Sequence, residues 1–110
     1  MQLKAIMDEL DLSPVFLTDR AGDLDVQAAY CGDLLSDVLA HVPAHALWFT
    51  IQAHVNIVAV AQLRDVACVV LVNGVAPDPQ TVAKARDQGV NICSSAENSA
   101  ALCMRLAGKL

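Results

Sequence analysis

The stretch Val66-Ala67-Cys68-Val69-Val70-Leu71-Val72 is the longest uninterrupted apolar run in the chain. A strand that is apolar at every position is typical of a parallel sheet covered by helices on both faces. The turn pair Asn73-Gly74 closes the run. A run of seven residues is far shorter than the ~18 that suggest a membrane span. Residues 67–72 are therefore predicted to form the central strand of an α/β sheet, with Cys68 as a small core residue.

The segments around this strand alternate between helical and extended patterns. Residues 2–11 have apolar positions at helical spacing, and Pro14 ends that helix. Asp78 and Pro79 suit the N-cap and first position of another helix, which Gly89 ends. The predicted helices are 2–11, 34–41, 54–64, 79–88 and 95–107, and the predicted strands are 15–18, 26–31, 47–51, 67–72 and 90–93.

The order of these elements predicts the fold class. The second half reads as strand-helix-strand-helix-strand, which implies parallel strands, right-handed crossovers and helices on both faces. The helix at 54–64 is nearly all apolar between its ends, so we expect it to be buried on most sides. Ser94 and Glu97 match a capping box for the last helix. We expect a three-layer α/β/α sandwich around a mostly parallel five-stranded sheet, forming a single domain over residues 1–110.

Composition excludes several classes of protein. With 55% apolar and 17% charged residues, the chain is not a disordered tail. Its net charge of −5, without a basic stripe, disfavours nucleic acid and anionic membranes as partners. No targeting segment is visible, so we expect a cytoplasmic protein. The four cysteines (31, 68, 93 and 103) form no Cys-x-x-Cys pair, and in a cytoplasm we expect them to be reduced.

Polar residues follow four of the predicted strands. Ligands of open α/β sheets bind beyond the carboxyl ends of the strands, where the free N–H groups of helix N-termini attract anions. A small anion or phosphorylated metabolite would suit such a site, although capping and turn formation explain the same residues. The candidates are Cys31, Gly32, Asp33 and Ser36 after the second strand, Thr50, Gln52, His54 and Asn56 after the third, Asn73 and Gly74 after the fourth, and Ser94 and Ser95 after the fifth.

The segment from Thr50 to Asn56 has a polar residue at every second position between an apolar strand and an apolar helix. Its side chains could present amides and an imidazole to a ligand or a partner chain. They could equally form a polar network that fixes the loop and caps the helix. Both interpretations remain open at the level of sequence.

Catalytic chemistry has weaker support. Cys31 precedes a predicted helix N-terminus, which would lower the pKa of its thiol, and it could act with His54 in a small transferase or hydrolase. The chain has no nucleophile elbow, no phosphate-binding loop and no Gly-x-Gly-x-x-Gly motif. We therefore expect no cofactor and no catalytic residues.

Two further pairs of residues have the spacing of a possible site. Asp33 and Asp37 lie one helical turn apart and could form an acid pair, but carboxylates in a first turn also simply stabilise the helix dipole. His41 and His45 have a spacing that can serve a metal, but Pro43 between them argues against one continuous helix. We expect no metal site.

Three stretches of the chain resemble the core of the DRTGG domain family: residues 30–40, residues 47–61 and Val72-Asn73-Gly74. The His54-x-Asn56 pair is the most specific part of the resemblance. The family is named for an Asp-Arg-Thr-Gly-Gly motif, which matches Asp25-Val26-Gln27-Ala28-Ala29 here, so only the aspartate agrees. Alanines in place of both glycines argue against a ligand role for that loop.

The resemblance implies a non-catalytic regulatory or assembly module, often a homodimer, like those within phosphotransacetylases and CBS-containing pyrophosphatases. The N-terminal domain of HPr kinase is similar, but this chain lacks that enzyme's phosphate loop. We expect a homodimeric regulatory domain whose candidate ligand is a small anionic metabolite or nucleotide. A ligand-free scaffold that docks on a metabolic enzyme, and a small enzyme using His54 and Cys31, are the alternatives.

Overall fold

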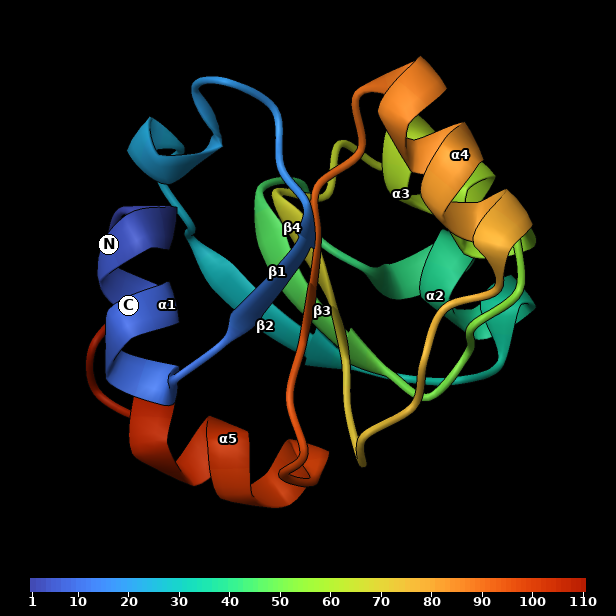
Figure 1. The fold of residues 1–110 in the computed structure, drawn as a ribbon. Coiled ribbons are helices and arrows are strands. Elements are labelled where there is room, and N and C mark those ends of the chain that lie inside the picture. Colours follow the sequence, from blue (N-terminus) through green and yellow to red (C-terminus); the bar gives the residue numbers. More distant parts are fainter.

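The apolar run forms the middle strand of a five-stranded sheet in the computed structural model, which describes residues 1–110 (Figure 1). The strands are β1 (Ser13–Phe16), β2 (Ala28–Cys31), β3 (Ala46–Thr50), β4 (Cys68–Leu71) and β5 (Ile92–Ser94). Their order across the sheet is β1-β5-β4-β3-β2. Strands β2 to β5 are parallel, and β1 pairs antiparallel with β5. The predicted mostly parallel sheet is confirmed.

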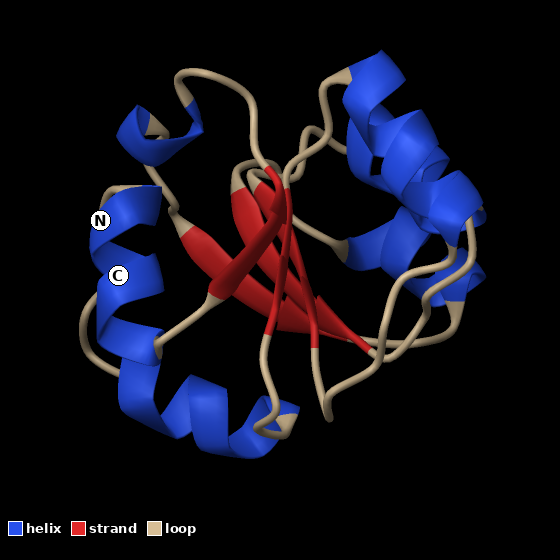
Figure 2. Cartoon of the chain, viewed as in Figure 1, coloured by secondary structure: helices blue, strands red, loops and turns tan.

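Helices cover both faces of this sheet (Figure 2). The helices are α1 (Leu3–Leu10), α2 (Leu35–His41), α3 (Asn56–Leu63), α4 (Pro79–Gln88) and α5 (Ser99–Leu106), with a short 3-10 helix η1 (Ala21–Asp23) before β2. Helices α1 and α5 pack on one face, and α2, α3 and α4 pack on the other. The three-layer sandwich is therefore confirmed.

Alternation along the buried strands divides the core into two layers. In β3, Leu47 and Phe49 contribute to the core beneath α1 and α5, whereas Trp48 contributes to the core beneath α2, α3 and α4. Val70 and Leu71 of β4 divide in the same way. All five of these side chains are fully buried, which explains why the central strands are apolar without interruption.

The predicted capping box of the last helix is wrong, and the first strand lies at Ser13–Phe16 rather than at 15–18. Ser94 and Glu97 do not cap the last helix, because that helix begins at Ser99. Its N-cap is Asn98, whose side-chain oxygen accepts a hydrogen bond from the Ala101 backbone N–H at 2.8 Å. Residues 95–98 form instead a short turn that lets the chain leave β5 before the helix starts.

Helix α3 is less enclosed than its composition suggested. Four of its eight residues are buried, and the opposite side exposes Ala59, Gln62 and Leu63. An apolar helix in an outer layer of this sandwich still leaves one side uncovered. None of the helices is long and apolar enough to cross a membrane.

Candidate functional site

The loop after β2 is tied to the loop after β3 through Asp33. One carboxylate oxygen of Asp33 accepts hydrogen bonds from the Thr50 hydroxyl at 3.0 Å and from the Ile51 backbone N–H at 2.9 Å. The Gln52 side-chain amide donates to the Asp33 carbonyl at 2.9 Å, and the Gln52 backbone N–H donates to the Thr50 hydroxyl at 3.1 Å. The sequence placed these three candidates at one edge of the sheet, and the structure brings them into direct contact.

Gly32 takes part in the same junction. Its carbonyl accepts a hydrogen bond from the Trp48 indole at 2.9 Å, and its backbone N–H donates to the Phe49 carbonyl at 3.2 Å. A Cβ at this position would lie 3.1 Å from both Tyr30 and Val38, so a larger residue would displace its neighbours. The glycine therefore has a packing role at the end of β2.

His54 and Asn56 lie where α3 begins. The ring Nδ1 of His54 accepts a hydrogen bond from the Asn56 backbone N–H at 3.2 Å, and the His54 carbonyl accepts one from Ile57 at 3.1 Å. Both side chains are exposed, and that of Asn56 makes no hydrogen bond within the chain. Next to them, the Ala53 carbonyl accepts from the Thr81 hydroxyl at 2.7 Å, which fixes the loop against α4.

Asn73, Gly74, Ser94 and Ser95 lie at the ends of β4 and β5. Asn73 and Gly74 have φ values of 59° and 70°, the left-handed region that asparagine and glycine tolerate best. Their backbone N–H groups donate to the carbonyls of Glu97 and Ser95, both at 2.9 Å. The turn after β4 is thus held by the turn after β5.

A hollow of about 440 Å³ lies beside these two turns. Its polar lining includes the hydroxyl groups of three serines and one carboxylate, that of Asp11, but no lysine, arginine or histidine. It is lined by Asp11, Ser13, Gly74, Val75, Ala76, Pro77, Ser94, Ser95 and Ala96. The hollow unites only Gly74, Ser94 and Ser95 of the candidates, whereas Asp33, Thr50, Gln52, His54 and Asn56 lie outside it.

Asp33 and Asp37 do not form an acid pair. Asp37 accepts a hydrogen bond from the Tyr30 hydroxyl at 2.6 Å, and the His41 ring lies 3.2 Å from its other oxygen. The bond to Asp37 raises the pKa of the Tyr30 hydroxyl above its ordinary 10.0. Ser36, one residue before Asp37, is exposed and makes no side-chain hydrogen bond. Asp33 and Asp37 therefore form hydrogen bonds with different partners and not with a shared one.

The predicted activation of Cys31 is wrong. Burial and the neighbouring Cys103 thiol raise the pKa of Cys31 to about 11. Its sulfur lies 3.4 Å from the Cys103 sulfur, and its side chain makes no hydrogen bond to His54. Helix α2 begins at Leu35, four residues beyond Cys31, so its N-terminus does not stabilise the thiolate. Cys31 is not placed as an activated nucleophile.

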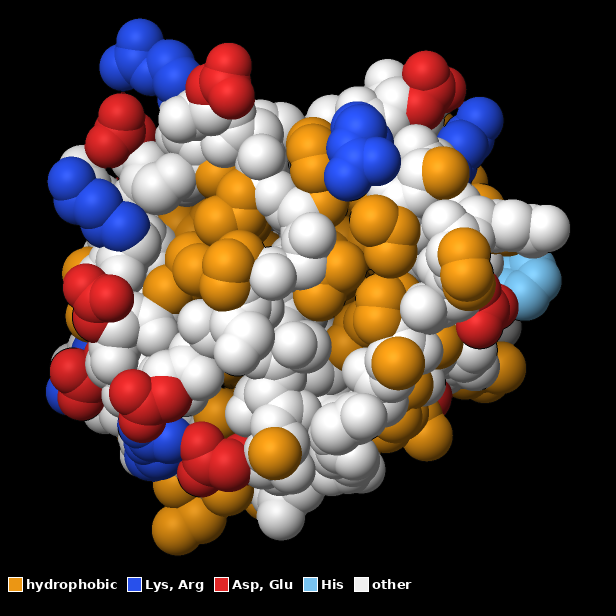
Figure 3. Space-filling model, viewed as in Figure 1, with side chains coloured by type: hydrophobic (Ala, Val, Ile, Leu, Met, Phe, Trp, Pro, Cys, Tyr) orange, Lys and Arg blue, Asp and Glu red, His pale blue; other side chains and the backbone are white.

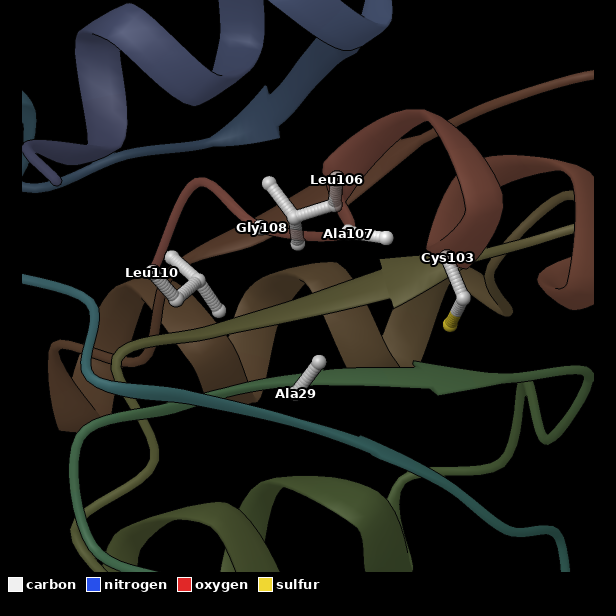
Figure 4. A pocket seen from close by; sticks show the side chains of 6 residues that line it. All are labelled: Ala29, Cys103, Leu106, Ala107, Gly108 and Leu110. Carbon is white, nitrogen blue, oxygen red and sulfur yellow. The ribbon is translucent and has the colours of Figure 1, made fainter.

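Sequence reasoning missed a small apolar hollow at the end of α5. Figure 4 shows Cys103, Leu106 and Leu110 on one side of it and Ala29 of β2 on the other. Its volume is about 160 Å³, and Ala107 and Gly108 complete the lining. These residues lie more than 70 positions from Ala29, and no local pattern joins them. Ala28 and Ala29 have ordinary negative φ values, so alanine fits where the DRTGG motif has glycine.

No group of three or more histidine, cysteine, aspartate or glutamate side chains is placed to hold a metal ion. The carboxyl edge of the sheet therefore holds three separate groups of polar residues. These are the Asp33 junction, the start of α3, and the turns around the 440 Å³ hollow. The side chains of Asp33, Thr50 and Gln52 hydrogen-bond to one another's loops, whereas that of Asn56 makes no hydrogen bond within the chain.

No protein-family model and no curated protein sequence matches the chain. Among solved structures, the fold is similar to a crystal structure of the CBS and DRTGG domains of the regulatory region of Clostridium perfringens pyrophosphatase, complexed with the activator diadenosine tetraphosphate. The superposition has a TM-score of 0.79 at 11% sequence identity and covers 99% of this chain. It covers 47% of the other chain, so this protein spans less than half of it. At this identity the likeness concerns the fold alone, and that fold is DRTGG-like.

Proposed function

We propose that the protein is a non-catalytic regulatory or assembly domain of the DRTGG type that acts as a homodimer. The observation that carries the proposal is the similarity of nearly the whole chain to a regulatory region. The raised pKa of Cys31 and the structural engagement of Asp33, Thr50 and Gln52 also favour a role without catalysis. The surface that best suits self-association is the edge of the sheet formed by β2.

Strand β2 is an open edge without the usual protection. It contains neither proline nor a charged residue, and the side chains of Ala29 and Cys31 are exposed. Edge strands with free backbone groups pair readily with other strands, and natural proteins normally block them with charge or proline. Two copies of β2 related by a two-fold axis would present the same strand to each other, as a closed dimer requires.

Several exposed apolar side chains lie on elements that follow β2, pair with it or contact it. Seven large apolar side chains of the chain are exposed, and five of them lie in the loops after β2 and β3, on α2, or in α5 and the residues after it. The most exposed of the five are Met104 at 78% and Leu34 at 69%. Apolar side chains mark an interaction site where they form one continuous surface, and the proposed dimer requires this of these five. We call the β2 edge with Leu34, Leu39, Ile51, Met104 and Leu110 the β2 surface.

The opposite edge of the sheet, formed by β1, is the alternative surface for self-association. Figure 3 views the molecule from this side and shows two groups of hydrophobic side chains, with charged side chains mainly along the left and upper rim. Two features block pairing here. β1 contains Pro14, which cannot donate a hydrogen bond, and the Arg86 guanidinium lies 5.7 Å from the centre of the Phe16 ring. We therefore favour the β2 surface.

The mass of the protein in solution tests self-association. Light scattering at micromolar concentration is expected to give twice the chain mass of 11.6 kDa. A mass of one chain at every concentration would contradict the proposed dimer.

A nucleotide is the second part of the proposal, favoured because the similar regulatory region was crystallised with diadenosine tetraphosphate. The hollow lined by Asp11 and serine hydroxyls has no positively charged side chain, so it suits a base or ribose better than phosphates. We expect adenosine and diadenosine tetraphosphate to raise the melting temperature, and inorganic phosphate and acetyl phosphate not to. A ligand at a hundred times its Kd shifts the melting temperature of a small domain by several degrees. No shift with any compound would favour the ligand-free scaffold that docks on a partner enzyme.

A further inference from the structure

Two thiols from distant parts of the chain meet at the β2 side of the molecule. The sulfur of Cys31, the last residue of β2, lies 3.4 Å from the sulfur of Cys103 in α5. The two residues are 72 positions apart, Cys31 is exposed, and Cys103 is half-buried. Both side chains thus face each other at a point that solvent reaches.

We propose that Cys31 and Cys103 form a reversible disulfide within one chain. A disulfide bond is about 2.0 Å long, so the sulfurs must approach by little more than an ångström from their present contact. Side-chain rotation and a small shift of an edge strand can supply that movement. The site adjoins the proposed dimer surface, since Cys31 ends β2, but the bond needs only one chain because both sulfurs belong to it.

The oxidant that the proposal requires is a small-molecule disulfide. One protein thiolate attacks it, a mixed disulfide forms, and one small-molecule thiolate leaves. The second protein thiolate then attacks the mixed disulfide at the protein sulfur and expels the second small thiolate. Two protein thiols are oxidised, one small disulfide is reduced to two thiols, and the two protons lost by the protein end on those products.

The order of attack follows from the surroundings of Cys31. Burial, and after it the hydrogen bond and charge of Cys103, raise its pKa to about 11, so Cys31 keeps its proton at neutral pH. Cys31 is therefore held back from the first attack, and it acts as the thiol that resolves the mixed disulfide. Once Cys103 carries the small thiol, two of the four causes that raise the pKa of Cys31 disappear, and partial burial and the charge of Asp33 remain.

The other cysteine pair provides an internal control. Cys68 of β4 and Cys93 of β5 are both fully buried in the core of the α1/α5 face. A small disulfide cannot reach them while the protein is folded. The cross-link between Cys31 and Cys103 would connect the edge strand to the closing helix and restrict the unfolded chain, which is how disulfides over long loops stabilise proteins.

The experiment incubates the folded protein with oxidised glutathione and reads the products by intact mass and by peptide mapping without reduction. We expect a mass lower by two hydrogens, a peptide that joins Cys31 to Cys103, and a melting temperature higher by roughly 10 °C. Cys31→Ser is expected to stop at one glutathione on Cys103, and Cys103→Ser to form no cross-link. Both variants must show the circular dichroism spectrum of the parent.

Four results would overturn the proposal. One is stable glutathione on Cys31 or Cys103 of the parent without a cross-link. The second is a bond that involves Cys68 or Cys93, and the third is a bond between two chains. The fourth is no oxidation of the folded protein under conditions that oxidise it in urea. A monomeric protein that still forms the Cys31–Cys103 bond would refute the dimer and leave this inference intact.

Discussion

Thr50 donates its hydroxyl hydrogen bond to Asp33, 17 residues earlier in the chain, at 3.0 Å. Thr50 is fully buried at the end of β3, whereas Asp33 is an exposed residue of the loop after β2. The same Asp33 oxygen accepts from the Ile51 backbone N–H at 2.9 Å. A single carboxylate therefore satisfies two donors that the end of a parallel strand would otherwise leave unpaired.

Replacement of Asp33 tests this junction. Asp33→Ala leaves the buried Thr50 hydroxyl without its acceptor and is expected to lower the free energy of unfolding by about 1–3 kcal/mol. Asp33→Asn retains an oxygen that can accept the hydrogen bond, so it should lower the free energy of unfolding by less. Urea unfolding measures both, with Ser36→Ala as the matched control, since that exposed hydroxyl makes no hydrogen bond and should change stability by less than about 0.5 kcal/mol. Equal effects of Asp33→Ala and Ser36→Ala would refute the role of the junction.

The pair Tyr30–Asp37 predicts an alkaline pH dependence. The hydrogen bond to Asp37 raises the pKa of Tyr30 above its ordinary 10.0. Because the folded-state pKa is the higher one, this contact contributes stability that is fully present below pH 10 and is lost as the pH rises through the folded-state value. Tyr30 is the chain's one tyrosine, so the absorbance of tyrosinate reports it directly.

We expect that absorbance to appear at higher pH in the folded protein than in the protein unfolded by urea. Asp37→Asn should bring the two titrations closer together. Coincident titrations of the folded and unfolded parent would show that the contact does not form.

The thiol of Cys31 is expected to be unreactive at neutral pH. A pKa of about 11, two units above the ordinary 9.0, leaves roughly 100-fold less thiolate than an unperturbed thiol has. Iodoacetamide labelling followed by peptide mapping should therefore show slow modification of Cys31 that accelerates with pH. Labelling of Cys31 at pH 7 faster than that of a free thiol would revive the enzyme hypothesis based on Cys31 and His54.

The start of α5 allows a direct comparison of two caps. Asn98→Ala removes the acceptor of the Ala101 backbone N–H and should cost about 1 kcal/mol of stability. Ser94→Ala removes the residue that the sequence pattern favoured, and its effect should be smaller because Ser94 lies in β5 before the helix. Thermal unfolding of both variants decides between the caps, and a larger loss from Ser94→Ala would favour the sequence-based assignment.

Much of the fold was predictable because its signals are local. The apolar run at 66–72, the Asp78-Pro79 helix start and the Gly89 helix end each depend on neighbours within a few residues, and the structure contains all three. The predicted capping box is wrong because its signal is also local. Ser94 and Glu97 have the correct spacing, but Ser94 is committed to β5 by its register with Ser13 and Leu71, which no local pattern reveals.

The candidate site was only partly predictable. The predicted strand ends place Asp33, Thr50 and Gln52 at one edge of the sheet. The hydrogen bonds that join Asp33 to the other two span 17 to 19 residues, which no local pattern reveals. The pKa of Cys31 was predicted with the wrong sign because its neighbour, Cys103, lies 72 positions away. The residues around the 440 Å³ hollow come from three separate segments of the chain, so their common lining follows only from the folded chain.

Association of two copies through the β2 surface can be tested by finding which edge strand an added charge must occupy to prevent it. Light scattering on the parent, Ala29→Lys and Ser13→Lys compares a charge placed on the exposed β2 edge with the same charge on the exposed β1 edge. We expect a dimer for the parent and for Ser13→Lys, and a folded monomer of 11.6 kDa for Ala29→Lys. A monomeric parent would contradict it, and so would a dimer that survives Ala29→Lys but is lost in Ser13→Lys.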